Sequence, residues 1–494
     1  MTSDAADVLI VGGGFAGLAA AHALVLVGRR AIVLEASAAV GGRVRQCLLD
    51  EAGTLAEAGG EFFHGGTSTS KKWADTIGLP TERVFTAAHG DGGPDDEPAP
   101  DGSIAYYFTE DGERFSFDSS DAGFEKLNAA LDRLRDVLSV AGVPESDTRS
   151  LRQYLHDEDV PARFLALAAA SYSNTLGVGD DLDSLPLRSV ARLERLWGAD
   201  GEGDFRVATR SSGRQLCLAA CCDALAFGTR VMTGWPVASV EIDGKRCCAT
   251  ATDGRKVYGA GVIIAAPVTL LQRGAIRFEP PLPSEKQSAI ASIRMANAIK
   301  LIVLLREPPW DEEQSPPRLH SVISAGAPGT VVPEIWFKRT LRGGWVASGF
   351  ATGSYADALV ARGEAAAVDV MLHQLARTLP SVTFEALTSR LVAARLVDWA
   401  SQGYVGGGYS APSFLECDGH RALYRRPECG GLLGFCGEAT EDACMTLSAA
   451  LESGRRAASE MLPVLPHATV RHNAALSSHG GRIPHRHPHP SSRL

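Results

Sequence analysis

The sequence predicts an α/β fold in which helices pack on a largely parallel β-sheet. The first observation is an apolar run of strand length at residues 8–11, followed at once by three glycines in the spacing G-x-G-x-x-G: Gly12, Gly14 and Gly17. The second is an alanine- and leucine-rich stretch over residues 15–27 that predicts a helix, with Gly28 placed to end it. The third is another apolar strand at residues 31–34. Strand, glycine turn, helix and strand in this order form a Rossmann-like βαβ unit.

The glycine turn has the features of a dinucleotide-binding site. The first glycine permits a tight turn, the second lets the backbone approach a pyrophosphate, and the third allows the helix to pack close to the strand. Phe15 and Ala16 begin the helix, and its free N–H groups and positive dipole end favour phosphate binding. Glu35 follows Gly17 by 18 residues, where an acid can hydrogen-bond a ribose hydroxyl. We therefore expect this unit to bind a dinucleotide.

Two further motifs indicate which dinucleotide it is. Residues 40–43 read V-G-G-R, and residues 57–65 read E-A-G-G-E-F-F-H-G. With the glycine turn, they resemble the flavin-containing amine oxidase family, which includes monoamine oxidases, polyamine oxidases and lysine-specific histone demethylases. The resemblance implies FAD, with its pyrophosphate near Gly42 and Arg43 and its flavin ring beside Gly60 and Phe62. The second motif is most similar to the polyamine oxidase version.

Composition narrows the function further. The 494 residues suffice for two or three domain-sized units, and 45% hydrophobic with 21% charged residues is typical of a globular protein. The net charge of −10 argues against a nucleic-acid partner and mildly favours cationic small molecules. The ten cysteines include no C-x-x-C pair, which favours reduced core thiols over a disulfide framework or a metal site. We expect no secretory signal and no membrane span, since no apolar run reaches about 18 residues.

The resemblance implies two domains, each assembled from separated segments. Residues 5–85, 207–287 and 400–463 would form the FAD-binding domain, and residues 86–206 and 288–399 an α+β substrate-binding domain. Residues 464–494 are rich in His, Pro and Ser and predict a disordered tail without a metal site. An acidic surface loop is expected over residues 89–102.

Local patterns predict several elements within these segments. Helices are expected over residues 70–76, 124–140, 151–171 apart from Pro161, and 214–226. Strands are expected over residues 229–232, 237–242, 247–252, 257–258 and 262–265, with glycine-containing turns between several of them. By resemblance, this second group of strands returns the chain to the FAD domain, where the backbone of Val237 would touch the adenine.

Residues 298–305, A-I-K-L-I-V-L-L, predict a strand with a single charge, Lys300. A lysine can discourage aggregation at the edge of a sheet, but an ionisable group inside an apolar run usually has a task. In the resembled family, a lysine at this place holds a water near the flavin N5 atom. We therefore expect Lys300 to act in catalysis.

The last motifs return the chain to the cofactor. Residues 398–410 resemble the family's tryptophan segment, with Trp399 at the flavin and Tyr409 as one wall of the family's aromatic cage. Gly408 stands where monoamine oxidases carry a flavin-linked cysteine, so non-covalent FAD is expected. In residues 430–458, Gly437 and Glu438 match the segment beside the ribityl diphosphate. The other residues of interest there are Met445, which replaces a usual small residue, and Thr446, which occupies the place of the second cage tyrosine.

The implied reaction is oxidation of an amine C–N bond. A hydride would pass from the substrate to flavin N5, the imine would be hydrolysed, and O2 would be reduced to H2O2; the flavin carries this chemistry. Lys300 and Tyr409 would be catalytic, and Glu61 and His64 would contact a cationic substrate; the alternative for these two is that they are polar loop residues bonded to backbone. A polyamine is the favoured substrate.

Three alternatives to polyamine oxidation remain. An L-amino-acid oxidase would carry an arginine for the substrate carboxylate where this chain has Phe62. A flavin desaturase would share the first motif but lack the Lys300 and tryptophan segments. A non-catalytic, flavin-stabilised scaffold is the third alternative.

The chain ends in Ser492-Arg493-Leu494, which is similar to the S-K-L address read by the peroxisomal import receptor. A peroxide-producing oxidase would suit that compartment. We therefore expect a peroxisomal location, with the cytosol as the alternative.

Overall fold

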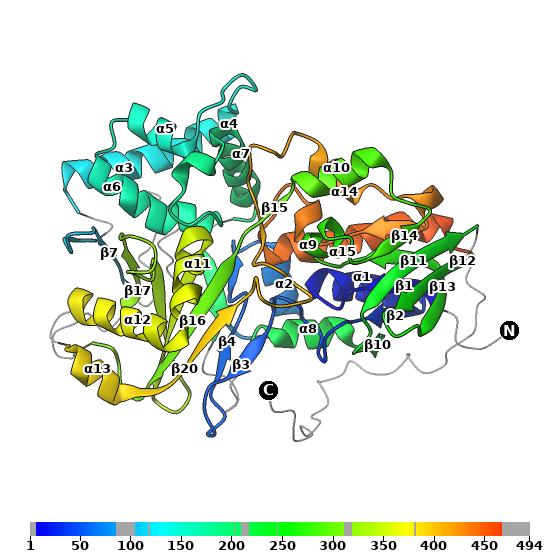
Figure 1. Ribbon diagram of the computed structural model, residues 1–494, viewed down its shortest axis with the longest axis horizontal. Coiled ribbons are helices and arrows are strands. Elements are labelled where there is room, and N and C mark those ends of the chain that lie inside the picture. The colour runs from blue at the N-terminus through cyan, green and yellow to red at the C-terminus, as the bar shows by residue number, and fades with distance from the viewer. Residues whose placement is uncertain are drawn as a thin grey trace.

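The computed structural model describes residues 6–84, 104–116, 119–201, 203–208, 217–244, 246–310, 319–379 and 382–466. Two sheets organise these residues, one in each half of the molecule (Figure 1). The expected acidic loop at 89–102, the start of the expected helix at 214, and the chain from 467 to its end lie outside the described residues. No described helix is long and apolar enough to cross a membrane.

The first sheet has eight strands and contains the predicted βαβ unit. Its order is β10-β2-β1-β13-β12-β11-β14, with β22 also paired to β13. Strands β10, β2, β1, β13 and β22 pair in parallel, whereas β13, β12 and β11 form an antiparallel meander. In chain order, the strands are β1 Ala6–Val11, β2 Ala31–Leu34, β10 Arg230–Met232, β11 Val237–Asp243, β12 Arg246–Ala251, β13 Lys256–Ile264, β14 Arg277–Glu279 and β22 Leu433–Phe435.

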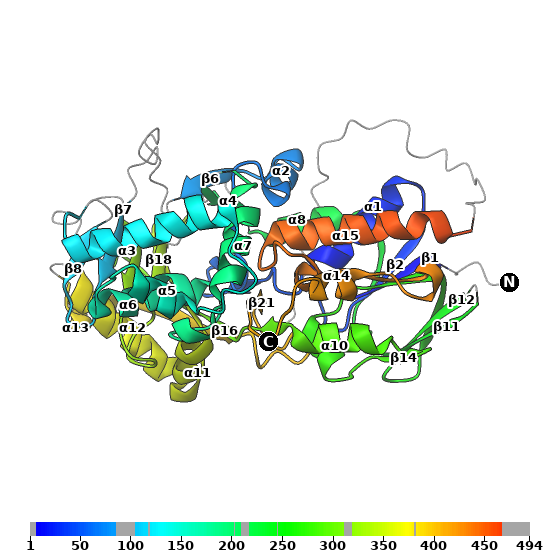
Figure 2. The ribbon, with the colours of Figure 1, turned by 90° about the horizontal axis from the view of Figure 1, so that it is seen from above.

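Helices cover both faces of this sheet because alternate residues of β1 point to opposite sides. Val8 and Ile10 pack in one core with helices α1, α8 and α15, and Leu9 and Val11 pack in another with α9, α10 and α14. Figure 2 shows α1 and α15 side by side on one face and α10 on the other. The bounds are α1 Phe15–Leu26, α8 Ala219–Ala226, α9 Val268–Gln272, α10 Ser284–Ser292, α14 His420–Arg425 and α15 Leu447–Met461.

Strand β13 differs from the prediction. Two short strands were expected at 257–258 and 262–265, but a single strand runs from Lys256 to Ile264. Its glycines serve close packing and do not form a turn: a Cβ on Gly261 would lie 2.7 Å from the Met461 sulfur of α15. The prediction therefore failed because glycine marks either a turn or a close approach, and only the fold distinguishes them.

The second sheet has seven strands in the order β20-β16-β19-β18-β17-β7-β8. All neighbours are antiparallel except β17 and β7, which are parallel. Helices α11, α12 and α13 pack on one face. The bounds are β7 Ile104–Phe108, β8 Arg114–Ser116, β16 Ala298–Leu305, β17 Leu319–Ser324, β18 Glu334–Arg339, β19 Trp345–Thr352, β20 Leu391–Asp398, α11 Gly353–Arg362, α12 Glu364–Thr378 and α13 Phe384–Arg390.

Strand β16 has the predicted bounds, and its two faces explain where its lysine lies. Ile299 and Leu301 pack in the core under α11–α13. Ile302 and Leu304 belong to a separate cluster with the hairpin of β3 (Gln46–Leu48) and β4 (Leu55–Glu57). Because alternate residues share a face, Lys300 points with the second set, away from the helices and toward the first half of the molecule.

A helical layer completes the second half of the molecule and is drawn in cyan in Figure 1. The helix expected over 124–140 is α3 (Ala122–Asp132) followed by a π-helical turn η1 (Arg133–Leu138) and α4 (Ser139–Ala141). The helical stretch expected over 151–171 is interrupted at the excepted Pro161, which is the N-cap of α6. The remaining parts are α5 Leu151–Asp157, α6 Ala162–Ala168, the π-helical η2 Ala169–Ser173, η3 Leu182–Ser184 and α7 Leu187–Gly198.

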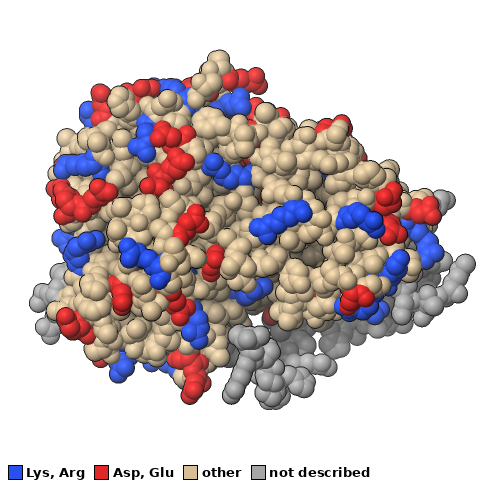
Figure 3. Space-filling model, in the orientation of Figure 1, with Lys and Arg blue, Asp and Glu red and all other residues tan. Residues whose placement is uncertain are grey.

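Short elements connect the two halves. Strands β5 (Phe62–His64), β9 (Asp204–Val207) and β6 (Thr81–Val84) form a small sheet, and β15 (Arg294–Met295) pairs with β21 (Ser410–Ala411). The remaining elements are α2 Thr69–Thr76, η4 Cys429–Gly431, η5 Glu438–Thr440 and η6 Leu462–Val464. The described residues extend to Pro466, past the predicted start of the tail at 464, and the Pro466 carbonyl accepts a hydrogen bond from Arg29. On the face in Figure 3, charges of both signs are interspersed.

Candidate active site

A cavity of about 760 Å³ is lined by residues from both halves of the molecule. We call the part lined by the turn between β1 and α1 the first end, and the part lined by β16, β18 and the end of α7 the second end. It brings together these predicted site residues: Gly12, Gly14, Phe15, Ala16, Glu35, Gly42, Arg43, Gly60, Glu61, Phe62, His64, Val237, Lys300, Trp399, Tyr409, Gly437, Glu438 and Thr446. Gly17 was predicted with them but is not part of the lining.

The glycine turn at the first end is shaped by close approaches of the backbone. Gly12 has φ +108°, a conformation that favours glycine. A Cβ on Gly17 would lie 2.0 Å from the Gly12 carbonyl oxygen, so Gly17 lets α1 pack against the turn without touching the cavity. Gly14 is the N-cap of α1, and no described side chain caps this terminus. The first N–H groups of α1 are therefore available to an anion in the cavity.

Glu35 is fixed beside this turn. It follows β2 and is buried, and one carboxylate oxygen accepts a hydrogen bond from the Gly13 N–H at 2.7 Å. The other oxygen accepts from the backbone N–H and the hydroxyl of Ser37, at 2.8 and 2.6 Å. These hydrogen bonds orient the carboxylate at the part of the cavity that Val237 also lines, where it can contact a ribose.

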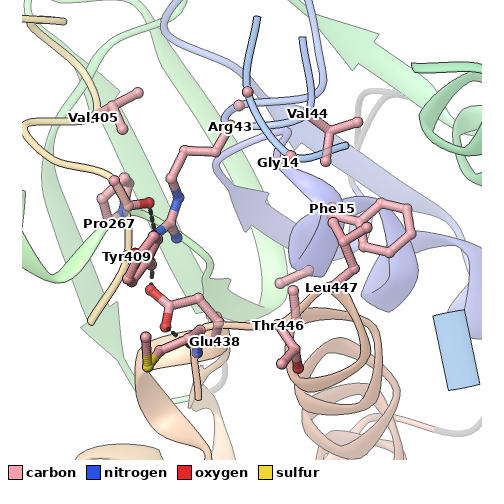
Figure 4. Close-up of a pocket in the computed structure, with 18 of the residues that line it drawn as sticks. Gly14, Phe15, Arg43, Val44, Pro267, Val405, Tyr409, Glu438, Thr446 and Leu447 are labelled. Atoms are coloured by element: carbon pink, nitrogen blue, oxygen red, sulfur yellow. Dashed lines mark hydrogen bonds and ion pairs between the residues drawn. The ribbon is translucent and has the colours of Figure 1, made fainter. Parts of the chain in front are cut away.

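A charged network crosses the middle of the cavity (Figure 4). Arg43 donates to the Glu438 carboxylate at 2.7 Å and to the Gly408 carbonyl at 2.9 Å. Burial raises the pKa of Glu438, but attraction to Arg43 and the hydrogen bond from Ser410 outweigh it and hold that pKa below its usual value. The guanidinium keeps further donors for a ligand, since an arginine carries five.

Arg421 of α14 supports this network and has no obvious signal in the sequence. It is buried, pairs with Glu416 at 2.5 Å, and donates to the Ser410 hydroxyl at 2.9 Å. Ser410 in turn donates to Glu438 at 2.7 Å. The chain segment that carries Tyr409 is therefore tied to Glu438 and to α14.

Lys300 lies at the second end of the cavity and is paired with Glu61. Its ammonium nitrogen is 2.5 Å from the Glu61 carboxylate and 3.2 Å from the Glu57 carbonyl oxygen. The same nitrogen lies 4.9 Å from the centre of the Trp336 ring. Glu61, expected to contact the substrate, thus has a partner within the protein.

Glu334 is the main residue that the sequence analysis missed. It begins β18, it is buried, and it lines the cavity. Phe350 of β19 pairs with Glu334 on one side and with Lys300 on the other, so the three residues form one row across the sheet. The signal that could have found Glu334 is an acid opening the apolar run E-I-W-F, the same argument that identified Lys300.

His64 is paired across the small sheet with Asp204. The two residues are register partners of β5 and β9, and the imidazole Nδ1 lies 2.6 Å from the buried carboxylate. Burial lowers the pKa of His64, but the charge of Asp204 outweighs burial and raises it above the usual value. The Asp204 charge therefore favours the protonated form of the imidazole.

Aromatic residues form walls around Lys300 and Glu334. Phe62 meets Trp336 edge to face, with ring centres 5.1 Å apart. The Tyr409 hydroxyl donates to the Thr175 carbonyl at 2.7 Å, and burial near Glu334 and Glu438 raises the pKa of Tyr409 well above its usual value. Tyr409 is therefore a neutral, oriented wall of the cavity.

The remaining predicted residues hold the walls of the cavity in place. The Trp399 indole donates to the Ala58 carbonyl at 3.0 Å. The Thr446 hydroxyl accepts from the Ala449 N–H at 3.0 Å and so caps α15. Met445 has φ +74°, which explains why a small residue is usual at this position: the conformation favours glycine. Its N–H donates to Glu438 at 3.2 Å.

The family profile of flavin containing amine oxidoreductases matches residues 15–462 of this chain. The chain belongs to this family. It is therefore an amine oxidoreductase that uses FAD, and the desaturase and non-catalytic alternatives are set aside.

Individual relatives differ in the substrates that their names give. An L-amino acid dehydrogenase from Synechocystis is 26% identical over 442 residues, which cover 83% of this chain and 84% of the relative. A putrescine oxidase from Kocuria rosea is 24% identical over 491 residues, 92% of this chain and 95% of the relative. A lysine-specific histone demethylase homologue from Oryza sativa is 29% identical over 322 residues, but this chain spans only 38% of its length.

A solved structure shows that the fold is shared. Wild-type putrescine oxidase bound to putrescine superposes with a TM-score of 0.72 at 23% identity, covering 93% of this chain and 99% of that one. The predicted α/β fold is confirmed by this match and by the sheets described above.

The residues present fit FAD. The uncapped terminus of α1 and Arg43 can hold the diphosphate, Glu35 the ribose, and the Val237 backbone the adenine, which leaves the end with Lys300 and Tyr409 for the flavin ring. At Gly408 there is no thiol, and a Cβ there would lie 2.5 Å from the Ala298 Cβ, so this position cannot supply a covalent link.

Proposed function

We propose that the protein is an oxidase of amines that carry a second cationic group, with polyamines or diamines as the substrate class and O2 as the electron acceptor. When bound, FAD would supply the two-electron chemistry: the electrons removed from the amine would pass to O2, which would be reduced to H2O2. The names of the putrescine oxidases similar to this chain support the substrate class.

The observation that carries the proposal is the Glu334 carboxylate. Among the described residues, none is hydrogen-bonded or ion-paired to it, and the two cationic groups that attract it, Lys300 and His64, already have partners in Glu61 and Asp204. A buried carboxylate without a partner is costly, and an ammonium group in the cavity would remove that cost. A substrate with a second ammonium can satisfy Glu334 while its reacting nitrogen lies elsewhere.

The other residues have supporting tasks. Phe62, Trp336 and Tyr409 give apolar walls that exclude water and orient the aliphatic chain of the substrate. Lys300 would fix a water near the flavin ring, as the family resemblance implies. The His64–Asp204 pair would make the adjoining wall of the cavity polar.

Oxidation of an L-amino acid is the second candidate, because an L-amino acid dehydrogenase is among the relatives. Its carboxylate would need an arginine. Three described arginines line the cavity, namely Arg43, Arg45 and Arg135. Arg43 is engaged by Glu438, Arg45 lies over the Trp399 ring, and Arg135 pairs with Asp132 at 3.2 Å. Phe62 still occupies the position expected for the carboxylate-binding arginine, so we rank this candidate second.

A screen of substrates tests the choice between them. We expect peroxide release from putrescine, spermidine, spermine or their acetyl derivatives with higher kcat/KM than from monoamines or L-amino acids, because that ratio measures discrimination. Turnover of L-amino acids with the higher ratio would refute the proposal and favour the second candidate.

The pH dependence of substrate preference is a further expected result. Burial and the nearby Asp204 charge raise the pKa of Glu334 to about 7, against the attraction of His64 and Lys300. The Glu334 side chain is therefore mostly ionised above pH 7 and mostly protonated, and so neutral, below it. The ratio of kcat/KM for a diamine to that for a monoamine should fall by up to about tenfold per pH unit below 7.

Both substrates carry a reacting amine that can be protonated, so the effect of this protonation on kcat/KM cancels in the ratio. Steady-state kinetics between pH 5.5 and 8.5 would measure it. A ratio that stays flat over this range would contradict the role given to Glu334.

A further inference from the structure

The strongest feature outside the proposed substrate contacts is the ion pair between Lys300 and Glu61. The two side chains are 5% and 4% exposed, and they come from chain positions 239 residues apart. We propose that Glu61 is a positioning residue that keeps Lys300 charged and directs its remaining N–H into the cavity. The catalytic unit at this end of the cavity is then the pair and not the lysine alone.

Counting donors shows what the pair leaves available. An ammonium group has three N–H donors. One is taken by the Glu61 carboxylate and one by the Glu57 carbonyl. The third has no acceptor among the described residues, and Lys300 lines the cavity. A water or a reacting group in the cavity is therefore the acceptor that the geometry provides for.

Glu61, and not its neighbour Glu57, is the counter-ion. Burial raises the pKa of Glu61, but attraction to Lys300, Lys338 and Arg206 outweighs burial and lowers that pKa below its usual value. Burial raises the pKa of Glu57 to about 7, and one of its oxygens is already bonded to the Leu218 N–H at 2.7 Å. The charge on Lys300 is thus balanced by the Glu61 carboxylate. Glu57 contributes only its backbone carbonyl, as a hydrogen-bond acceptor.

The consequence is a positive charge fixed at the flavin end of the cavity. An ammonium group buried without a counter-ion gives up its proton readily, whereas a paired one keeps it. Conversion of O2 to H2O2 takes two electrons and two protons, and oxygen carries negative charge before both protons arrive. Paired with Glu61, Lys300 contributes its positive charge to that step. This consequence rests on the oxidase function proposed above, but the ion pair itself does not.

A double-mutant cycle on the oxygen reaction tests the inference. The FAD-loaded enzyme is reduced with dithionite, which needs no amine, and mixed with O2 in a stopped-flow instrument. Lys300→Met should slow reoxidation on the order of 100-fold, and Glu61→Gln by about tenfold at pH 7, since each removes or weakens one preorganised charge. If Glu61 acts only through Lys300, Glu61→Gln should cost nothing further in the Lys300→Met background. Additive losses in the double variant would overturn the inference.

The pH profile and the absorption spectrum give readouts that a merely structural role would not move. In Glu61→Gln the reoxidation rate should fall as pH rises, and the spectrum of bound oxidised FAD should shift with pH. Neither should happen in Lys300→Met, and Glu61→Asp should restore the behaviour of the parent. A Glu61→Gln spectrum that does not change with pH would overturn the inference, even in an enzyme that does not react with oxygen.

A second buried lysine supplies the matched control. Lys286 pairs with Glu428 at 3.3 Å and is fully buried, but neither residue lines the cavity. Glu428→Gln should lower stability and leave the reoxidation rate and its pH profile unchanged. An equal change in rate there would mean that any loss of a buried ion pair slows the enzyme, and would contradict a specific role for Glu61.

Discussion

Replacing Gly17 by alanine is expected to abolish FAD binding and to destabilise the first half of the molecule. The added Cβ would lie 2.0 Å from the Gly12 carbonyl oxygen and 3.0 Å from the Ala265 Cβ. The first contact is with backbone, so α1 must move away from β1 and the anion site at its N-terminus moves with it. Overpacking of this kind costs about 1–3 kcal/mol or more. A change of ~1 kcal/mol lowers the unfolding temperature by roughly 2–4 °C in a domain of 150–250 residues.

Two other glycines of the same helix separate folding from cofactor binding. Gly14 has φ −74°, and a Cβ there would meet only Gly42, at 4.0 Å, so Gly14→Ala should fold normally. It should nevertheless lose FAD affinity by roughly 100-fold, equivalent to ~3 kcal/mol, because the methyl group enters the space of the diphosphate. Gly28→Ala, at the far end, has open space but a φ of +76° that strains an alanine, so it should lower stability and keep full FAD affinity. FAD titration and thermal unfolding measure both; a Gly17→Ala protein with the FAD affinity of the parent would refute the packing argument.

The sequence predicted the features that depend on neighbours in the chain. The glycine turn, α1, β2 and β16 needed only local spacing and an apolar pattern, and each formed within a residue or two of its predicted bounds. The π-helical turn over Arg133–Leu138 left no such pattern, because its extra residue per turn is fixed by packing. Gly261 was misread for a related reason: only the position of Met461 distinguishes a close approach from a turn.

The residues of the candidate site show the same difference between local sequence patterns and contacts that only the fold creates. Lys300 was found because a charge stands out in an eight-residue apolar strand. Glu334 was missed because its run is short and its importance comes from the row with Phe350 and Lys300, which the register of β16, β19 and β18 creates. The partner of Glu61 is 239 residues away in the chain, so its ion pair with Lys300 could not be read from the sequence.

Replacing Glu334 by glutamine is expected to change substrate preference more than any other substitution at the second end of the cavity. The Glu334 carboxylate is buried and has no hydrogen-bond or ion-pair partner among the described residues, so neutralising it removes the attraction for a second ammonium group. The kcat/KM for a diamine should fall by roughly 100-fold or more, since losing one side of a buried charge pair costs about 2–5 kcal/mol. The kcat/KM for a monoamine of similar length should stay within about threefold, because it makes no such contact.

Stability and pH dependence distinguish this role from a structural one. Glu334→Gln removes a buried charge that has no ion-pair partner among the described residues, so its unfolding temperature should equal or exceed that of the parent, whereas loss of a structural carboxylate would lower it. The diamine-to-monoamine ratio should also become independent of pH, because the group with a pKa of about 7 is gone. Glu82→Gln is the matched control: Glu82 pairs with Arg206 at 2.7 Å and does not line the cavity, so neither ratio nor profile should change. If Glu334→Gln slows diamines and monoamines equally, the carboxylate does not recognise the second cation, and the substrate class proposed here is wrong.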